Sequence, residues 1–287
     1  MNFYNLLVSC YRFYLQVLFT IVPRYAAKRA FHLFATPIVK KNRQREIEVL
    51  KRAKKTILNK KGLNIHVYEW GEGAKTALLV HGWEGNAGSN TGFVDPLLKA
   101  GYKVVAFDGP AHGKSDGKRT NVIHFSEIMK PLFLAHKPEL MITHSFGSAA
   151  TSFLLYNNPD LSLDKLVMVT TPNRIGDIIA EFAGYMRIKP NQLTLIFQHL
   201  EKRFGRAVSE LSVGRMLQQA NVKEILVIHG PADRVLGYKY AQQVAHEVPR
   251  ARLLDSPSKG HYRILWDEDT FDKVLTFAET PAAEVED

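Results

Sequence analysis

The sequence predicts an α/β protein with a mostly parallel sheet and helices on both faces. Short apolar runs alternate with helical segments over most of the chain, which is the pattern of strands joined by crossover helices. Most of these runs are apolar throughout, as expected for strands buried on both faces. A length of 287 residues is ample for such a core.

Eight segments are expected to form the sheet. The first two are separated by Lys60-Lys61-Gly62, which predicts a hairpin turn. The strands are expected over residues 57–58, 63–70, 76–80, 103–107, 140–143, 165–170, 224–229 and 251–254. Helices are expected near residues 92–100, 121–136, 145–156, 237–247 and 267–278.

The stretch between residues 170 and 224 does not fit this alternation. Its three helical segments, with breaks at Pro172 and Pro190, cover residues 175–187, 191–204 and 208–219. Because long structureless loops are uncommon in compact domains, the stretch predicts a helical cap over 173–220, inserted into a core of 56–172 and 221–287. The cap's apolar residues are expected to pack on the core, and a few to line a substrate pocket, with Phe182, Met186 and Phe197 as candidates.

The net charge of +10 is concentrated near the N-terminus. Residues 1–61 hold 14 Lys and Arg against Glu46 and Glu48, whereas the rest of the chain is nearly neutral. We treat residues 1–55 as a basic helical leader, interrupted at Thr36-Pro37. No aromatic-interleaved recognition motif accompanies the charge, so a solvated helical face is expected and a nucleic-acid partner is not.

Residues 3–22 predict an amphipathic helix. Its polar residues form one narrow stripe: Asn5, Ser9, Arg12, Gln16 and Thr20. Nothing basic precedes the apolar run, which argues against a signal peptide, and Arg12 near the middle opposes a membrane span. Two interpretations remain. The helix lies on an anionic membrane surface, making a cytoplasmic protein peripheral on the inner membrane face, or its apolar face packs on its own domain or a second subunit.

Neither a cofactor nor a metal ion is expected. The single cysteine, Cys10, excludes an internal disulfide framework and a cysteine-based metal cluster, and it fits a reducing compartment. Histidines recur in the loops after strands, yet none has the H-x-x-x-H spacing with a carboxylate that binds a metal on a helix. These histidines are His81, His112, His144 and His229.

Ser145 stands between a predicted strand and a predicted helix. A nucleophilic serine uses this sharp turn, because the helix N-terminus and free backbone N–H groups stabilise negative charge there. Thr143 occupies the first glycine position of the G-x-S-x-G pattern, while Gly147 occupies the second. Taken alone, a serine between a strand and a helix is more often just a helix N-cap, and the motif by itself favours that interpretation.

Two further polar residues follow strands of the same sheet. Asp233 comes after 224–229 and His261 after 251–254. Ligand sites in parallel sheets form at the carboxyl ends of the strands, so Ser145, Asp233 and His261 are expected at one edge. Alternatives stay open: Asp233 as a turn-former with Asp108 as the acid, and His261 as an ordinary loop histidine.

Five motifs in order resemble those of the α/β-hydrolase superfamily. They are His81-Gly82-Trp83, Asp108–Ser115, Thr143–Gly147, His229–Asp233 and Gly260-His261. The resemblance covers about residues 56–278 and extends to capped, uncharacterised bacterial hydrolases of this fold. It implies an α/β-hydrolase fold and a Ser-Asp-His catalytic triad.

The resemblance also implies a role for each residue. Ser145 is the nucleophile, His261 the general base and Asp233 the residue that orients it. Backbone N–H groups of Trp83 and Phe146 form the oxyanion hole. His81 and His144 are further candidates for the substrate pocket. The competing expectations are that His81 hydrogen-bonds within its own loop and that His144 packs beside the turn at Ser145.

The expected activity is that of a serine hydrolase of the carboxylesterase, thioesterase or lipase type. It cleaves an ester or thioester of a small molecule through a Ser145 acyl-enzyme, and the apolar cap favours a hydrophobic acyl group. An acyltransferase or amidase on the same triad, or a non-catalytic binding protein of this fold, are the alternatives.

Overall fold

The computed structural model describes residues 3–38, 43–256 and 260–280. The chain divides into two compact units. The helical unit combines Met1–Thr36 with Arg174–Ser212, and the sheet unit contains Pro37–Asn173 and Val213–Asp287. Residues 39–42 of the expected leader lie outside the described residues.

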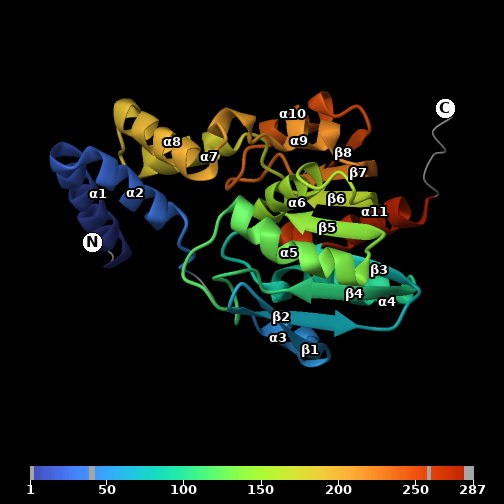
Figure 1. Cartoon of the computed structure of the whole chain (residues 1–287). Helices are drawn as coiled ribbons and strands as arrows, with labels where there is room; N and C mark the ends of the chain where they lie inside the picture. Colours follow the sequence, from blue (N-terminus) through green and yellow to red (C-terminus); the bar gives the residue numbers. More distant parts are fainter. Residues whose placement is uncertain (1–2, 39–42, 257–259, 281–287) are drawn as a thin grey trace. The chain divides into compact units, whose positions relative to one another are not determined.

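The sheet unit is organised around eight strands in the order β1-β2-β4-β3-β5-β6-β7-β8 (Figure 1). β1 and β2 pair antiparallel, as do β2 and β4, and the remaining neighbours are parallel. This confirms the predicted mostly parallel, eight-stranded sheet. The strands are β1 (Lys54–Lys60), β2 (Leu63–Trp70), β3 (Lys75–Val80), β4 (Tyr102–Phe107), β5 (Leu140–His144), β6 (Leu163–Val169), β7 (Val222–His229) and β8 (Ala251–Asp255).

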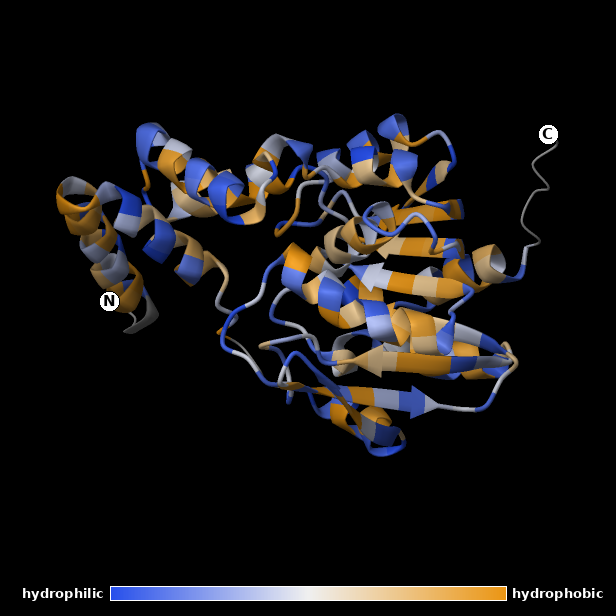
Figure 2. Ribbon diagram, in the orientation of Figure 1, coloured by the Kyte–Doolittle hydropathy of each residue, from blue (hydrophilic) through white to orange (hydrophobic). Residues whose placement is uncertain are grey.

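Helices cover both faces of this sheet. On one face α5, α6, α9 and α10 contact one another in series, and on the other α4 and α11 are in contact. Apolar residues of the strands, α4 and α11 form one buried cluster, which includes Leu79, Leu97, Ile142 and Phe277. The strands are largely hydrophobic along their length (Figure 2). The helices are α4 (Val94–Lys99), α5 (Val122–His136), α6 (Phe146–Tyr156), α9 (Val213–Gln219), α10 (Lys239–Glu247) and α11 (Glu268–Glu279), with 3-10 turns η1 (Ala87–Phe93) and η3 (Arg263–Trp266).

Part of the basic leader packs on this core. Helix α3 (Gln44–Lys51) places Leu50 in the same cluster as α4 and α11. The carbonyl of Val49 accepts a hydrogen bond from the indole N–H of Trp70 at 3.0 Å. Residues of α3 are therefore fixed to the sheet unit, which the charge pattern alone did not predict.

The helical unit joins segments that are far apart in the sequence. α1 (Phe3–Ile21) and α2 (Pro23–Phe34) share one apolar cluster with α7 (Ile175–Tyr185) and α8 (Pro190–Phe204). Leu15 and Phe19 of α1 are buried there with Ile196 and Leu200 of α8. Helices α1 and α2 thus share a core with α7 and α8, whereas the sequence predicted a separate leader and cap.

The third expected helix of the cap, residues 208–219, is interrupted. η2 (Val208–Glu210) ends it early, and α9 belongs to the sheet unit. Asn173 explains the break, because its carbonyl and side-chain oxygen accept hydrogen bonds from the N–H groups of Val213 and Gly214 at 2.9 and 3.0 Å. These contacts cap a new helix at residue 213.

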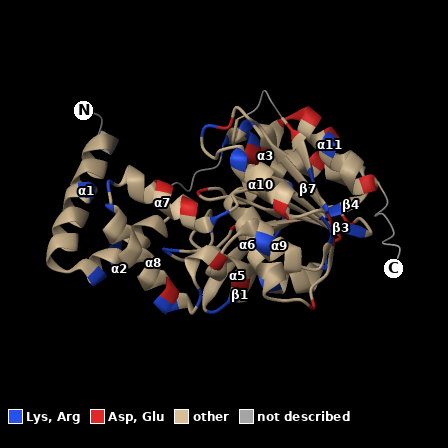
Figure 3. Cartoon of the chain, turned by 90° about the horizontal axis from the view of Figure 1, so that it is seen from above, with Lys and Arg blue, Asp and Glu red and all other residues tan. Residues whose placement is uncertain are grey.

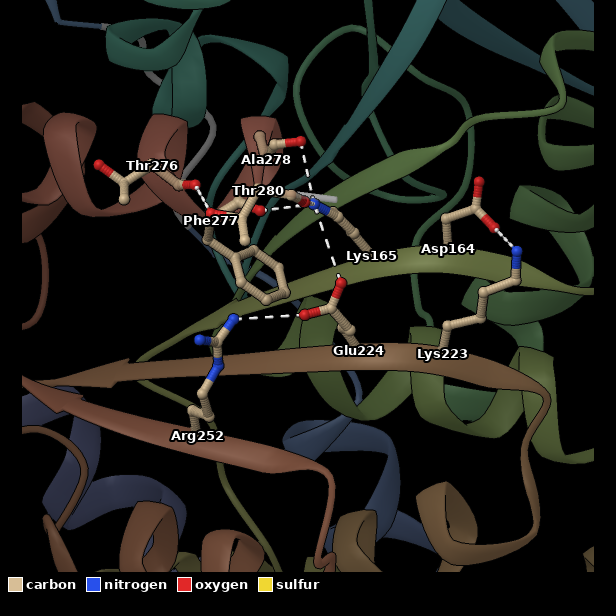
Figure 4. A network of polar contacts seen from close by, with 9 residues as sticks. All are labelled: Asp164, Lys165, Lys223, Glu224, Arg252, Thr276, Phe277, Ala278 and Thr280. Carbon is tan, nitrogen blue, oxygen red and sulfur yellow. Dashed lines mark hydrogen bonds and ion pairs between the residues drawn. The ribbon is translucent and has the colours of Figure 1, made fainter. Parts of the chain in front are cut away.

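A buried lysine on β6 holds the end of α11 (Figure 4). The Lys165 ammonium donates to the carbonyls of Phe277 at 2.7 Å and Ala278 at 3.1 Å, and also to that of Thr280. The last carbonyls of a helix lack partners within the helix and carry the negative end of its dipole. Lys165 therefore satisfies these groups and fixes the final helix to the middle of the sheet.

Replacing Lys165 with methionine should lower the free energy of unfolding by about 2–4 kcal/mol, because several charge-assisted hydrogen bonds are lost together. Urea denaturation measures the change. The matched control is Lys223→Met on β7, whose ion pair with Asp164 is exposed and should contribute little to stability. Equal effects of the two substitutions would contradict this account of Lys165.

Candidate active site

Ser145 lies at a strained turn between β5 and α6. Its backbone angles are φ 49° and ψ −117°, in a region that costs a non-glycine residue roughly 1–3 kcal/mol. The N–H of Ser145 donates to the carbonyl of Val169 on β6 at 3.0 Å, which anchors the turn. A Cβ at Gly147 would lie 2.6 Å from the His81 carbonyl oxygen, so only glycine allows α6 to start this close to the end of β3.

Thr143 is accommodated in this turn by its hydrogen bonds. Its hydroxyl lies 2.9 Å from the hydroxyl of Ser148 and donates to the carbonyl of Val167 at 3.1 Å. Thr143 is completely buried, so an unpaired hydroxyl there would be costly. Ser148, in the first turn of α6, is thus a polar partner for the residue that replaces glycine.

Asp233 and His261 are joined directly. The Nδ1 atom of His261 lies 2.7 Å from Oδ2 of Asp233, and both side chains are buried. Asp233 follows β7, and its other carboxylate oxygen accepts hydrogen bonds from the N–H groups of Val235 and Leu236 at 2.7 and 2.9 Å. The bond at Nδ1 leaves Nε2 of His261 as the nitrogen available for proton transfer.

The surroundings of Asp233 keep its carboxylate ionised. Burial raises the pKa of Asp233, but hydrogen bonds from His229 and His261 outweigh this effect and hold the pKa well below its usual range. His229 is completely buried, and its Nε2 donates to the Leu236 carbonyl at 3.1 Å while lying 3.4 Å from Asp233. A charged Asp233 favours a proton on Nδ1 of His261.

The loop after β3 lies directly beside Ser145. A Cβ at Gly82 would be 3.1 Å from that of Ser145 and 2.7 Å from Nδ1 of His144. The ring of Trp83 packs at 5.3 Å, edge to face, on that of Phe146. Phe146 is the first residue of α6, where backbone N–H groups have no partner within the helix. Trp83 and Phe146, the residues predicted for the oxyanion hole, are therefore brought together.

Two buried histidines connect this loop to the loop after β4. The N–H of Gly109 donates to Nε2 of His81 at 2.9 Å, and the N–H of Glu84 donates to Nε2 of His112 at 3.1 Å. The opposite ring nitrogens lie 2.7 and 3.0 Å from the carbonyls of Gly82 and Pro110. Because a carbonyl only accepts, both rings are neutral with the proton on Nδ1. Burial lowers the pKa of His81 to about 4.

His144 connects the turn at Ser145 to the loop that carries His261. Its Nε2 donates to the carbonyl of His261 at 3.0 Å, and the two rings are 4.7 Å apart. Burial lowers the pKa of His144 well below its usual value, and the nearby His261 acts in the same direction.

His81 and His144 thus have the positions of the competing expectations, within the β3 loop and beside the turn at Ser145. Both rings are buried. Backbone atoms bond to both ring nitrogens of His81 and to Nε2 of His144, and the assignment of these two histidines to a substrate pocket stays a prediction.

Asp108, the alternative acid, serves a different purpose. Its carboxylate accepts hydrogen bonds from the N–H groups of Ala87 and Lys114 at 2.8 and 2.9 Å and from the Tyr68 hydroxyl at 3.1 Å. These contacts fix η1 and the loop after β4. In contrast to Asp233, Asp108 is held by backbone and tyrosine partners, and its pKa is raised by burial.

The three candidate pocket residues of the cap all belong to the helical unit. Met186 is buried in the apolar cluster of that unit, and Phe182 and Phe197 pack against it while partly exposed. Their role in a substrate pocket stays a prediction. Within the part of the chain that the structure describes, no group of three or more His, Cys, Asp or Glu side chains is placed to hold a metal ion.

The sequence did not predict that the leader contacts the site. The N–H of Ile38 donates to the Glu84 carboxylate, in the loop after β3, at 2.9 Å. The guanidinium of Arg43 lies 5.6 Å from the ring of Tyr262, which follows His261. The pattern of Lys and Arg in this stretch is equally typical of a solvated helix. The charge pattern alone therefore does not predict these two contacts.

Comparison with known proteins identifies a family and a fold. A family model described as the alpha/beta hydrolase family matches residues 77–284. A hydrolase of Escherichia coli O81 that is named for 2-hydroxy-6-oxononadienedioate and 2-hydroxy-6-oxononatrienedioate is 44% identical over 59 residues; this match spans only 20% of either chain.

Among solved structures, an esterase of Pyrococcus furiosus is similar with a TM-score of 0.61 and 20% identity, over 86% of this chain and 98% of the other. The mouse alpha/beta hydrolase domain-containing protein 10 has a TM-score of 0.59 and 13% identity, over 79% and 97%. At these identities the similarity shows the fold alone.

The neutral form of His81 predicts a pH dependence of stability. Between about pH 6.5 and pH 4 the unfolded chain protonates this histidine and the folded chain does not, so the free energy of unfolding falls as the pH is lowered. His81→Gln should reduce this fall by up to about 3 kcal/mol. Urea denaturation at several pH values measures it.

The matched control is His246→Gln, at an exposed position of α10, which should keep the wild-type pH dependence. If His81→Gln also kept it, the histidine would not be held neutral in the folded protein.

Proposed function

The chain belongs to the alpha/beta hydrolase family, and from this premise we propose that it is a serine hydrolase that cleaves a carboxylic ester or thioester through an acyl-enzyme on Ser145. The observation that carries the proposal is the 2.7 Å contact between His261 and Asp233, two residues from the ends of different strands. Their buried pair lies against His144, the residue that precedes Ser145 at the strained turn.

In the first half of the reaction, Oγ of Ser145 attacks the carbonyl carbon of the substrate. Nε2 of His261 takes the hydroxyl proton, and the carbonyl π electrons move to oxygen. The N–H groups of Trp83 and Phe146 then stabilise the oxyanion. Collapse of the tetrahedral intermediate breaks the bond to the alcohol or thiol, which takes the proton from His261 as it leaves and gives an acyl-Ser145 ester.

In the second half, water hydrolyses the acyl-enzyme. His261 takes a proton from the attacking water and returns it to Oγ of Ser145, which releases the carboxylic acid and restores the enzyme. Asp233 supports both halves, because its ionised carboxylate holds the Nδ1 proton and stabilises the imidazolium. No oxidant or cofactor enters this balance.

A hydrophobic acyl group is the proposed substrate class. Its support is the set of apolar residues on α7 and α8, of which Phe182 and Phe197 keep part of their surface exposed. Such side chains are typical of pockets that bind aliphatic ligands. The leaving group is an alcohol or thiol of unspecified structure.

A fluorophosphonate probe should label the wild-type protein and not Ser145→Ala, because it reacts with an activated serine hydroxyl. In-gel fluorescence measures the labelling. The control is Ser209→Ala, an exposed serine of the helical unit, which should label as the wild type does. Equal labelling of Ser145→Ala and wild type, or no labelling of either, would favour a non-catalytic binding protein.

Turnover of p-nitrophenyl esters should increase with acyl chain length, with kcat/KM for the octanoate exceeding that for the acetate by at least about tenfold, since each buried methylene adds binding free energy. No turnover at any chain length would contradict esterase activity. Faster release of p-nitroanilide, or acyl transfer to an added alcohol, would identify an amidase or an acyltransferase.

Asp233→Asn should lower kcat for these esters by about 10⁴-fold, because the imidazole of His261 would adopt the wrong tautomer.

A further inference from the structure

Two polar residues of α1, Arg12 and Gln16, contact another part of the helical unit. The guanidinium of Arg12 donates through Nε to the carbonyl of Tyr185 at 3.0 Å and lies 5.1 Å from the Tyr185 ring. Nε2 of Gln16 donates to the carbonyl of Arg187 at 2.8 Å. These carbonyls belong to the end and the C-cap region of α7, where helical carbonyls lack partners. Two members of the polar stripe thus cap a neighbouring helix instead of facing water.

This orientation leaves an apolar face of α1 exposed. Leu15 and Phe19 are buried beside the polar contacts, whereas Phe13 is 73% exposed and Ile21 70% exposed. At 100° per residue, six of the exposed apolar side chains of α1 project over an arc of about 120°, and Tyr11, which is also exposed, lies about 40° outside it. We call this set the outer face of α1: Leu6, Leu7, Phe13, Tyr14, Val17 and Ile21. Figure 2 shows how much of α1 is hydrophobic.

The outer face is continuous and uncharged. Single exposed apolar side chains are ordinary on protein surfaces, but a contiguous patch marks a surface that another body covers. None of the described helices has the length and apolarity needed to cross a membrane. Because Leu15 and Phe19 are buried in the core of the helical unit, a partner can meet only the exposed side of α1.

Charge distinguishes between the possible partners. Residues 1–36 contain four Lys and Arg and no Asp or Glu, and Figure 3 shows blue segments at α1 and α2. Arg24 and Lys28 of α2 are exposed and close in sequence to the end of α1. A second copy would bring two chains of net charge +10 together. An anionic lipid surface complements this charge, and exposed tyrosines such as Tyr14 and Tyr25 are typical of the membrane interface.

We propose that the outer face of α1 docks the protein on an anionic lipid bilayer, with α1 lying in the plane of the interface. The polar contacts of Arg12 and Gln16 fix α1 on α7, so the helical unit presents this face as a preformed surface. The proposal rests on side-chain exposure and charge and is independent of the catalytic assignment of Ser145.

Cys10 provides a reporter for this docking. It is the only cysteine of the chain, it is exposed, and its helical angle lies within the outer face. An environment-sensitive fluorophore on Cys10 should shift its emission to the blue with phosphatidylcholine–phosphatidylserine vesicles. Vesicles of phosphatidylcholine alone, or high salt, should reduce the shift, and flotation of the unlabelled protein should show the same order.

The double substitution Phe13→Ser/Ile21→Ser should weaken binding to the anionic vesicles by about tenfold or more, because two large apolar side chains no longer enter the bilayer. The matched control is Ile57→Ser/Leu134→Ser, which changes residues that are 59% and 50% exposed on β1 and α5. It should bind as the wild type does. Arg24→Gln/Lys28→Gln should bind more weakly and with less dependence on salt.

Three results would overturn the proposal. The first is that the wild type does not bind anionic vesicles, and the second is that the Phe13/Ile21 and control variants lose binding equally. The third is that the wild type is a dimer that does not bind vesicles and that Phe13→Ser/Ile21→Ser converts to a monomer. The last result would assign the face to a second copy. Hydrolysis of p-nitrophenyl acetate, a soluble substrate, should be unchanged in all these variants. Failure of docking is therefore distinguishable from failure of the proposed catalysis.

Discussion

The close approach of backbones at the carboxyl edge of the sheet is the constraint on which the candidate site depends. Gly147 and Gly82 are positions where a Cβ would collide, with the His81 carbonyl in one case and with Ser145 and His144 in the other. The lack of side chains lets the start of α6 and the loop after β3 share one small volume. Backbone N–H groups can then lie around the position beside Ser145. The buried histidines around it hydrogen-bond to backbone groups of the neighbouring loops and so hold these loops in place.

Much of this arrangement follows from the sequence. Apolar runs and one hairpin turn predict all eight strands, and the rule for parallel sheets predicts that Ser145, Asp233 and His261 lie at one edge. The partner of each histidine could not be predicted in the same way. His81, His112 and His144 bind backbone carbonyls and N–H groups. Nearly all residues carry these same backbone groups, so the residue types do not indicate which of them a histidine will contact. His81 and His144 were therefore open to assignment as pocket residues.

The helical segments were harder to predict for a related reason. A polar stripe with Arg12 and Gln16 indicates a helix with two unlike sides, but it does not distinguish water from the carbonyl end of another helix as the partner of the polar side. Likewise, the pattern over 208–219 continues through a point where Asn173, far away in the sequence, begins a new helix. In both cases a tertiary contact decides between structures that local periodicity leaves equivalent.

The shared core of α1, α2, α7 and α8 has a consequence for biosynthesis. The ribosome releases the first two helices long before residues 174–212, so Leu15 and Phe19 have no partners from α7 and α8 while the intervening strands are made. The nascent chain must carry this apolar hairpin while the intervening residues are translated. The helical unit can be completed only when residues 174–212 emerge, well after α1 and α2.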